Sequence, residues 1–208
     1  MEDCILNDIN SKHCDCVNQG VINLLLLNVC GLIRRSQYPD VIELINKYEI
    51  LCFVETKTDD ADKINIPGFD VIMKNRFKMN RTKSVGIVLA FKKHLGDFIH
   101  PLESDSKYVL WFKVDKQLFR MRQDVIFGIV YIPPENSIYC TGDPFCEMES
   151  EFLDYSANYE NICLVGDFNA RTAEDLDYTE TAYDEFSGML DITNSHFLIR
   201  DLNIDMNR

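Results

Sequence analysis

Short apolar runs, separated by polar and turn-forming residues, recur along the chain from residue 21 onward. Most of these runs are continuous rather than alternating, which is typical of strands covered on both faces. The predicted strands are Val21–Val29, Ile50–Val54, Val71–Met73, Val85–Phe91, Val109–Val114, Val125–Ile132 and Ile162–Val165.

Two segments between these runs have the spacing of amphipathic helices. The first begins near Pro39, and its apolar residues recur at i, i+3, i+4 and i+7: Val41, Leu44, Ile45 and Tyr48. The second is expected to have Asp143 as its N-cap and Pro144 as its first residue. Its apolar stripe consists of Phe145, Met148, Phe152, Tyr155 and Tyr159. We interpret both stripes as core-packing faces.

The order of these elements combines parallel crossover units with antiparallel hairpins. This predicts an α/β fold in which two mixed sheets pack together with helices outside. We expect an irregular lead-in at residues 1–20 and a single domain over 21–208. The segment 171–208 has nine Asp and Glu against three Arg. It is expected to form a long surface loop and the start of a further element, without a closing strand.

Composition restricts the classes of function. With 208 residues and a formal charge of −13, the chain does not hold nucleic acid by bulk charge alone. The basic residues are nevertheless concentrated in one stretch, which contains Lys74, Arg76, Lys78, Arg81 and Lys83. The sequence has no secretory signal and no apolar run near 18 residues, so we expect an intracellular protein, nuclear or cytoplasmic, that is not secreted and binds no membrane.

The chain contains eight cysteines. In an intracellular protein these are expected to be reduced. The cluster His13-Cys14-Asp15-Cys16 is open to a metal-binding interpretation, but no second ligand pair follows at a usable spacing.

Polar residues lie where four of these apolar runs end. They are Asn28, Glu55, Tyr131 and the pair Asp167 and Asn169. Each alone is weak evidence of a site, because Asp and Asn favour turns and a Tyr at a strand end is more often a half-buried aromatic. If the strands are neighbours, however, their ends converge where open α/β sheets place their sites. Carboxylates and carboxamides suit Mg²⁺, which binds few protein ligands and takes its other ligands from water and phosphate, better than they suit zinc.

Four motifs around these residues occur in the order found in one enzyme family. They are Asn28-Val-Cys-Gly-Leu, Phe53-Val-Glu-Thr-Lys, Val130-Tyr-Ile-Pro-Pro and Gly166-Asp-Phe-Asn-Ala-Arg. Together they resemble the endonuclease/exonuclease/phosphatase family, and most closely the endonuclease domains of non-LTR (LINE-like) retrotransposons. The resemblance implies a four-layer α/β sandwich that hydrolyses phosphate esters with Mg²⁺, or with Mn²⁺ in its place. It also implies DNA as the substrate and a reverse transcriptase domain in a complete parent protein.

The resemblance assigns a role to each strand-end residue. Glu55 resembles the metal-binding carboxylate and Asn28 the asparagine beside it. Tyr131 resembles a phosphate-contacting tyrosine, Asp167 the aspartate that orients or activates water, and Asn169 its partner. Within the basic stretch, the residues expected to bind DNA are Arg76, Lys78 and Arg81.

The family also uses a late Ser-Asp-His motif, which this sequence lacks. His196 is the only histidine after Asn169, and no Asp lies beside it. We therefore expect a chain without its final strands, with low stability and impaired activity. Two alternatives stay open: a non-catalytic remnant of a retroelement reading frame, and a phosphatase or phosphodiesterase of this fold with another substrate.

Overall fold

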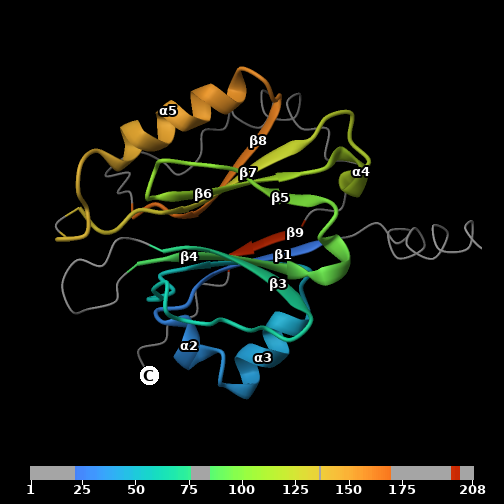
Figure 1. Ribbon diagram of the computed structural model, residues 1–208, viewed down its shortest axis with the longest axis vertical. Helices are drawn as coiled ribbons and strands as arrows, with labels where there is room; N and C mark the ends of the chain where they lie inside the picture. Colours follow the sequence, from blue (N-terminus) through green and yellow to red (C-terminus); the bar gives the residue numbers. More distant parts are fainter. Residues whose placement is uncertain (1–21, 76–84, 136, 170–197, 202–208) are drawn as a thin grey trace, which may run out of the picture.

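The computed structural model describes residues 22–75, 85–135, 137–169 and 198–201, and these form four layers (Figure 1). One sheet has the strand order β3-β4-β2-β1-β9, and the other has the order β5-β6-β7-β8. The strands of the first sheet are β1 (Asn23–Asn28), β2 (Ile50–Val54), β3 (Phe69–Lys74), β4 (Ile87–Lys92) and β9 (Leu198–Asp201). Those of the second are β5 (Ile99–Pro101), β6 (Val109–Val114), β7 (Val125–Tyr131) and β8 (Asn161–Asp167).

Helices cover the two outer faces of the sandwich. Figure 1 shows α2 (Leu32–Arg35) and α3 (Pro39–Asn46) below the first sheet and α5 (Pro144–Ser156) above the second. The short helix α4 (Lys116–Phe119) and the 3₁₀ turn η2 (Lys93–Leu95) connect strands. The predicted α/β sandwich of two mixed sheets with outer helices is confirmed.

The apolar residues form three cores, one at each boundary between layers. Residues of β1 contribute to two of these cores. Leu24 lies in the core between the sheets, while Leu25 and Leu27 pack toward α3. Above the second sheet, Trp111 packs with the α5 residues Met148, Phe152 and Tyr155. The central strands β2 and β7 are buried along their whole length, as their continuous apolar sequences predict.

Both amphipathic helices are confirmed, with corrections at their ends. Pro39 is the first residue of α3, and the Asp143 carboxylate accepts 3.1 Å hydrogen bonds from the amides of Phe145 and Cys146. Phe145 is 44% exposed, so its place in the predicted packing stripe was wrong. Tyr48 and Tyr159 pack on the cores but lie beyond the last helical residues.

Several strand boundaries differ from the sequence pattern. The run that was expected to begin at Val85 becomes a strand only at Ile87, because Val85 and Gly86 have φ angles of 69° and 101°. The short strand β5 was not predicted. Strand β9 pairs parallel to β1, with Asn23 opposite Leu198, inside the segment that was expected to hold a loop and the start of a further element. The rest of that segment lies outside the described residues. The predicted lead-in at residues 1–20 lies outside the described residues.

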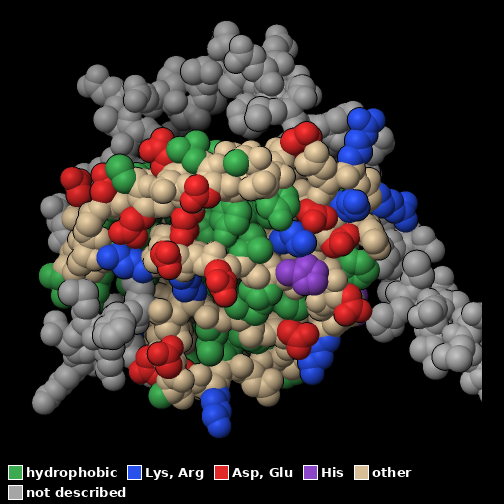
Figure 2. Space-filling model, turned by 45° about the horizontal axis from the view of Figure 1, so that its top comes forward, with side chains coloured by type: hydrophobic (Ala, Val, Ile, Leu, Met, Phe, Trp, Pro, Cys, Tyr) green, Lys and Arg blue, Asp and Glu red, His purple; other side chains and the backbone are tan. Residues whose placement is uncertain are grey.

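The described residues include no helix long and apolar enough to cross a membrane. Within the same ranges every cysteine is a free thiol: Cys30, Cys52, Cys140, Cys146 and Cys163. Burial raises the pKa of the Cys52 thiol, which lies in the core between the sheets. On the face shown in Figure 2, basic side chains are scattered among acidic ones rather than gathered into one area.

Candidate active site

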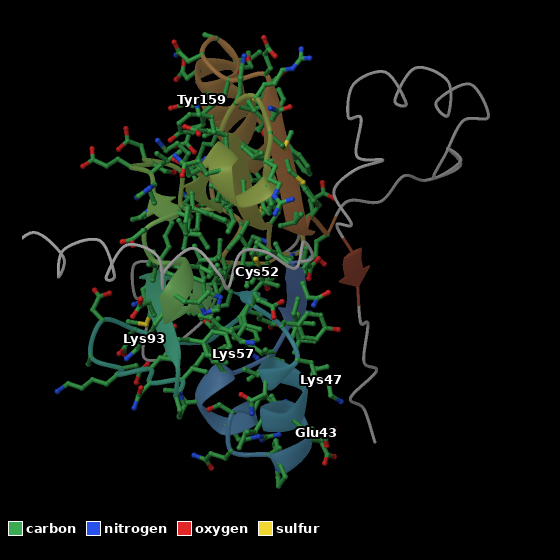
Figure 3. All side chains as sticks on the ribbon, turned by 90° about the vertical axis from the view of Figure 1, so that its right-hand side faces the viewer. Glu43, Lys47, Cys52, Lys57, Lys93 and Tyr159 are labelled. Carbon is green, nitrogen blue, oxygen red and sulfur yellow. The ribbon has the colours of Figure 1, made fainter. Side chains whose placement is uncertain are left out.

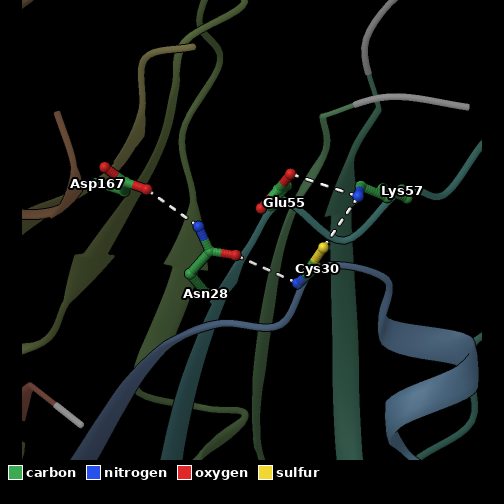
Figure 4. Close-up of polar contacts among 5 residues, drawn as sticks. All are labelled: Asn28, Cys30, Glu55, Lys57 and Asp167. Atoms are coloured by element: carbon green, nitrogen blue, oxygen red, sulfur yellow. Dashed lines mark hydrogen bonds and ion pairs between the residues drawn. The ribbon is translucent and has the colours of Figure 1, made fainter. Parts of the chain in front are cut away.

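Two parallel strand pairs bring the predicted polar residues to one edge of the sandwich. Strand β1 runs parallel to β2, and β7 runs parallel to β8. Asn28 is the last residue of β1, Glu55 directly follows β2, and Asp167 is the last residue of β8. The Asn28 Nδ2 atom donates a 3.0 Å hydrogen bond to Asp167 Oδ2, which joins the two sheets (Figure 4).

The turn after β8 is built around Asp167. The amide of Asn169 donates to Asp167 Oδ1 at 3.1 Å, and the Asn169 side chain donates to the carbonyl of Ile132 at 2.8 Å. Asn169 has a φ of 44°, a left-handed conformation that asparagine tolerates better than most residues. These bonds fix one carboxylate oxygen, while Asn28 holds the other.

Gly166 permits the close approach of β8 to β7. Its φ is 156°, and a Cβ at this position would lie 1.9 Å from the carbonyl oxygen of Val130. Any side chain here would push apart the two strands that position Asp167, so glycine is required by space as well as by conformation.

Tyr131 lies opposite Asp167 in the register of β7 and β8. Its side chain is only 5% exposed and belongs to the core between the sheets. The structure thus places the predicted phosphate-contacting tyrosine beside the site, with most of its ring buried.

The segment that carries Glu55 has an unusual backbone. Glu55 and Lys57 have φ angles of 55° and 52°, and the residue between them, Thr56, is buried. The Lys57 amide donates to the carbonyl of Val85 at 2.7 Å. A Cβ on Gly86 would lie 2.4 Å from the Thr56 hydroxyl. This tight packing turns Thr56 inward and leaves Glu55 and Lys57 partly exposed on the site side.

Lys57 and Cys30 are site residues that the sequence analysis did not identify. The Lys57 ammonium lies 3.5 Å from Glu55 Oε1 and donates to Cys30 Sγ at 3.0 Å (Figure 4). The Cys30 amide in turn donates to Asn28 Oδ1 at 3.2 Å. The hydrogen bond to Cys30 raises the pKa of Lys57 above its ordinary value, and the charge of Glu55 adds to the rise. Their positions in the sequence could have indicated this, because both residues lie within the motifs around Asn28 and Glu55.

A shallow pocket of about 290 Å³ adjoins this cluster on the α2 side. Its lining residues are Gly31, Ile33, Arg34, Gln37, Thr56 and Lys57. It therefore extends the site away from Asp167, and it carries two cationic side chains.

The donor chemistry fits a hard divalent cation. Glu55 and Asp167 supply carboxylate oxygens, and Asn28 supplies an amide oxygen. No group of three or more His, Cys, Asp or Glu side chains that could form a metal cage occurs in the described ranges. Mg²⁺ needs no such cage, because it keeps several waters and binds through one or two carboxylates and substrate phosphate.

The predicted DNA-binding residues Arg76, Lys78 and Arg81 lie outside the described residues, as does His196. Lys74, the first cation of the basic stretch, points inward. Its ammonium donates to the Ser104 hydroxyl and to the Val109 carbonyl, both at 2.8 Å. Burial lowers its pKa, so Lys74 supports the structure and does not extend a DNA-binding surface.

No protein-family profile and no curated protein matches the sequence. Among solved structures, the chain is similar to a 3′ phosphatase, NExo, from Neisseria bound to a product DNA hairpin, with 18% identity and a TM-score of 0.46 over 73% of this chain and 59% of that one. It is also similar to an AP endonuclease from Archaeoglobus fulgidus, with 16% identity and a TM-score of 0.46. That match covers 81% of this chain and 70% of the endonuclease chain.

A third similar structure is the catalytic domain of human Nocturnin with bound sulfate, with 12% identity and a TM-score of 0.45. That match covers 77% of this chain and 66% of the Nocturnin chain. This chain spans 59% of the length of the Neisseria protein. At these identities and TM-scores the similarity assigns neither a family nor an activity to this chain.

Proposed function

We propose that this chain is a Mg²⁺-dependent phosphodiesterase domain that nicks DNA, of the kind found in retrotransposon proteins that also carry a reverse transcriptase. The observation that carries the proposal is the hydrogen bond between Asn28 and Asp167. It joins two separate sheets at the edge where Glu55 also lies, and it holds a carboxylate beside polar groups suited to a phosphate and an attacking water.

Each residue has a role that follows from its contacts. Asp167, held on one oxygen by Asn28 and on the other by the Asn169 amide, orients the attacking water and accepts its proton. Asn169, anchored on the carbonyl of Ile132, supports the same turn. Glu55 and Asn28 would hold the cation. When bound, the cation would stabilise the negative charge that develops on the phosphate oxygens.

The proposal includes reduced activity for the chain as it stands. The 208 residues contain no Ser-Asp-His motif, so no histidine from such a motif polarises the phosphate. A second candidate function for the same site is a non-catalytic remnant that retains metal and phosphate binding. A phosphatase or phosphodiesterase with another substrate remains the third proposal for the same site.

Plasmid nicking separates these functions. Supercoiled DNA is incubated with excess protein and Mg²⁺, and the nicked form is followed over time with the wild type, Glu55→Ala, Asp167→Ala and the remote control Glu43→Ala. The proposal expects slow nicking that EDTA abolishes and that each site substitution lowers roughly 10²-fold or more. Equal rates in all four proteins indicate a contaminating nuclease and contradict the proposal. No nicking, with Mn²⁺ binding that still depends on Glu55, favours the remnant.

A further inference from the structure

Lys57 occupies an unusual position for a lysine beside a candidate cation site. Its ammonium is paired with Glu55 Oε1 at 3.5 Å. The same carboxylate is the one that a divalent cation at this edge would need, and a single carboxylate oxygen cannot serve both at full strength.

Two features make Lys57 displaceable rather than fixed. Its side chain is 38% exposed, so its ammonium is not locked by burial. Lys57 also lines the pocket together with Gly31, Arg34 and Gln37, and this adjoining space gives the ammonium room to move away from Glu55. The backbone, in contrast, is held by the 2.7 Å hydrogen bond to Val85.

The second partner of Lys57 keeps the ammonium near the site. Cys30 Sγ accepts from it at 3.0 Å, and the Cys30 amide is bonded to Asn28. The ammonium is therefore held beside Glu55 by two contacts, and Figure 4 shows it on the side of Glu55 away from Asn28 and Asp167.

We propose that Lys57 is a built-in cation that competes with the divalent metal for Glu55 and so sets the metal concentration at which the site fills. This inference rests on the proposed function, because it takes Glu55 as a metal ligand. Lys57 is a positioning residue here, since it acts through Glu55 and is assigned no contact with the reacting atoms.

The test measures metal binding instead of activity. Free Mn²⁺ is followed by electron paramagnetic resonance during titration of the full chain and four variants: Lys57→Met, Lys57→Arg, Glu55→Gln and Lys57→Met combined with Glu55→Gln. Lys47→Met is a matched control, because Lys47, at the C-terminal end of the outer helix α3, pairs with Glu43 at 2.8 Å (Figure 3). The fluorescence of Trp111, the only tryptophan and a buried one, reports that each variant is folded.

The proposal expects Lys57→Met to bind Mn²⁺ three- to tenfold more tightly than the wild type. Lys57→Arg and Lys47→Met should bind like the wild type, and Glu55→Gln should cancel the gain in the double variant. Unchanged affinity in Lys57→Met, with weakened binding in Glu55→Gln, overturns the role of Lys57 and leaves the metal site standing. Unchanged affinity in Glu55→Gln overturns both this inference and the metal site of the proposed function.

Discussion

Asn28 and Asp167 are joined by a 3.0 Å hydrogen bond although they are 139 positions apart in the sequence. One ends a strand of the first sheet and the other ends a strand of the second. The bond fixes the orientation of the Asp167 carboxylate, so the site depends on the relative position of the two sheets.

Removing this bond should lower activity without unfolding the chain. Asn28 is exposed, so Asn28→Ala leaves the cores intact but frees one oxygen of Asp167, and we expect roughly 10- to 100-fold slower plasmid nicking at saturating Mg²⁺. Asn28→Asp should be at least as slow, because it places a like charge against Asp167. Wild-type rates in Asn28→Ala would show that the bond does not position the catalytic group.

Gly166→Ala should destabilise the whole sandwich. Because the added Cβ would meet the Val130 carbonyl at 1.9 Å, we expect a loss of about 3 kcal/mol in the free energy of unfolding. The measurement is urea denaturation followed by Trp111 fluorescence. Gly68→Ala is the control, since Gly68 also has a positive φ of 87° but nothing lies within 4 Å of its Cβ position. Equal losses in the two variants would assign the effect to backbone conformation alone.

Glu151 of α5 accepts hydrogen bonds from strand β6 and from the loop that precedes it. Its carboxylate accepts from Trp111 Nε1 at 2.6 Å, from the Ser104 hydroxyl at 2.9 Å and from the Ser106 amide at 2.9 Å. Glu151→Ala leaves these donors without their acceptor, and we expect a loss of about 2–3 kcal/mol in urea denaturation. Glu151→Gln keeps one carbonyl oxygen and should lose less. An equal loss in the glutamine variant would show that the charge of Glu151, and not its hydrogen bonding, dominates.

Asp143 should make the stability of α5 depend on pH. Its bonds to the amides of Cys146 and Phe145 hold the pKa of the carboxyl below the ordinary 3.8. A lowered folded-state pKa means that the stabilisation is complete above 3.8 and is lost as pH falls through the lowered value. The difference in Tm between the wild type and Asp143→Ala should therefore be constant from pH 7 to 5 and shrink in more acidic buffers. Asp143→Asn, which keeps an acceptor that does not titrate, should show a difference from Asp143→Ala that is independent of pH.

The sequence predicted the elements whose patterns are local. The continuous apolar runs of β2 and β7 predicted buried strands. The Asp143-Pro144 pair predicted the start of α5, because Asp caps a helix and Pro suits its first position. The strands that were not predicted, β5 and β9, are three and four residues long. They owe their conformation to the partners β6 and β1, which no local pattern reveals.

The candidate site also contains residues that a local pattern predicts and one that it does not. The strand-end positions of Asn28, Glu55 and Asp167 could be predicted, because each follows an apolar run. The role of Lys57 could not, since it depends on the positive φ angles that direct its side chain toward Glu55 and Cys30. Lys74 likewise belongs to a basic stretch in the sequence but is directed inward by its contacts with Ser104 and Val109.

The pairing of β9 with β1 also has a consequence for synthesis on the ribosome. Asn23 is synthesised long before its partner Leu198. Until then β1 can pair with β2 on one side only, and its other side is an open strand edge that invites intermolecular association. Parallel contacts over such a separation also form slowly. The nascent chain should therefore depend on chaperones that shield this edge until β9 has emerged from the ribosome.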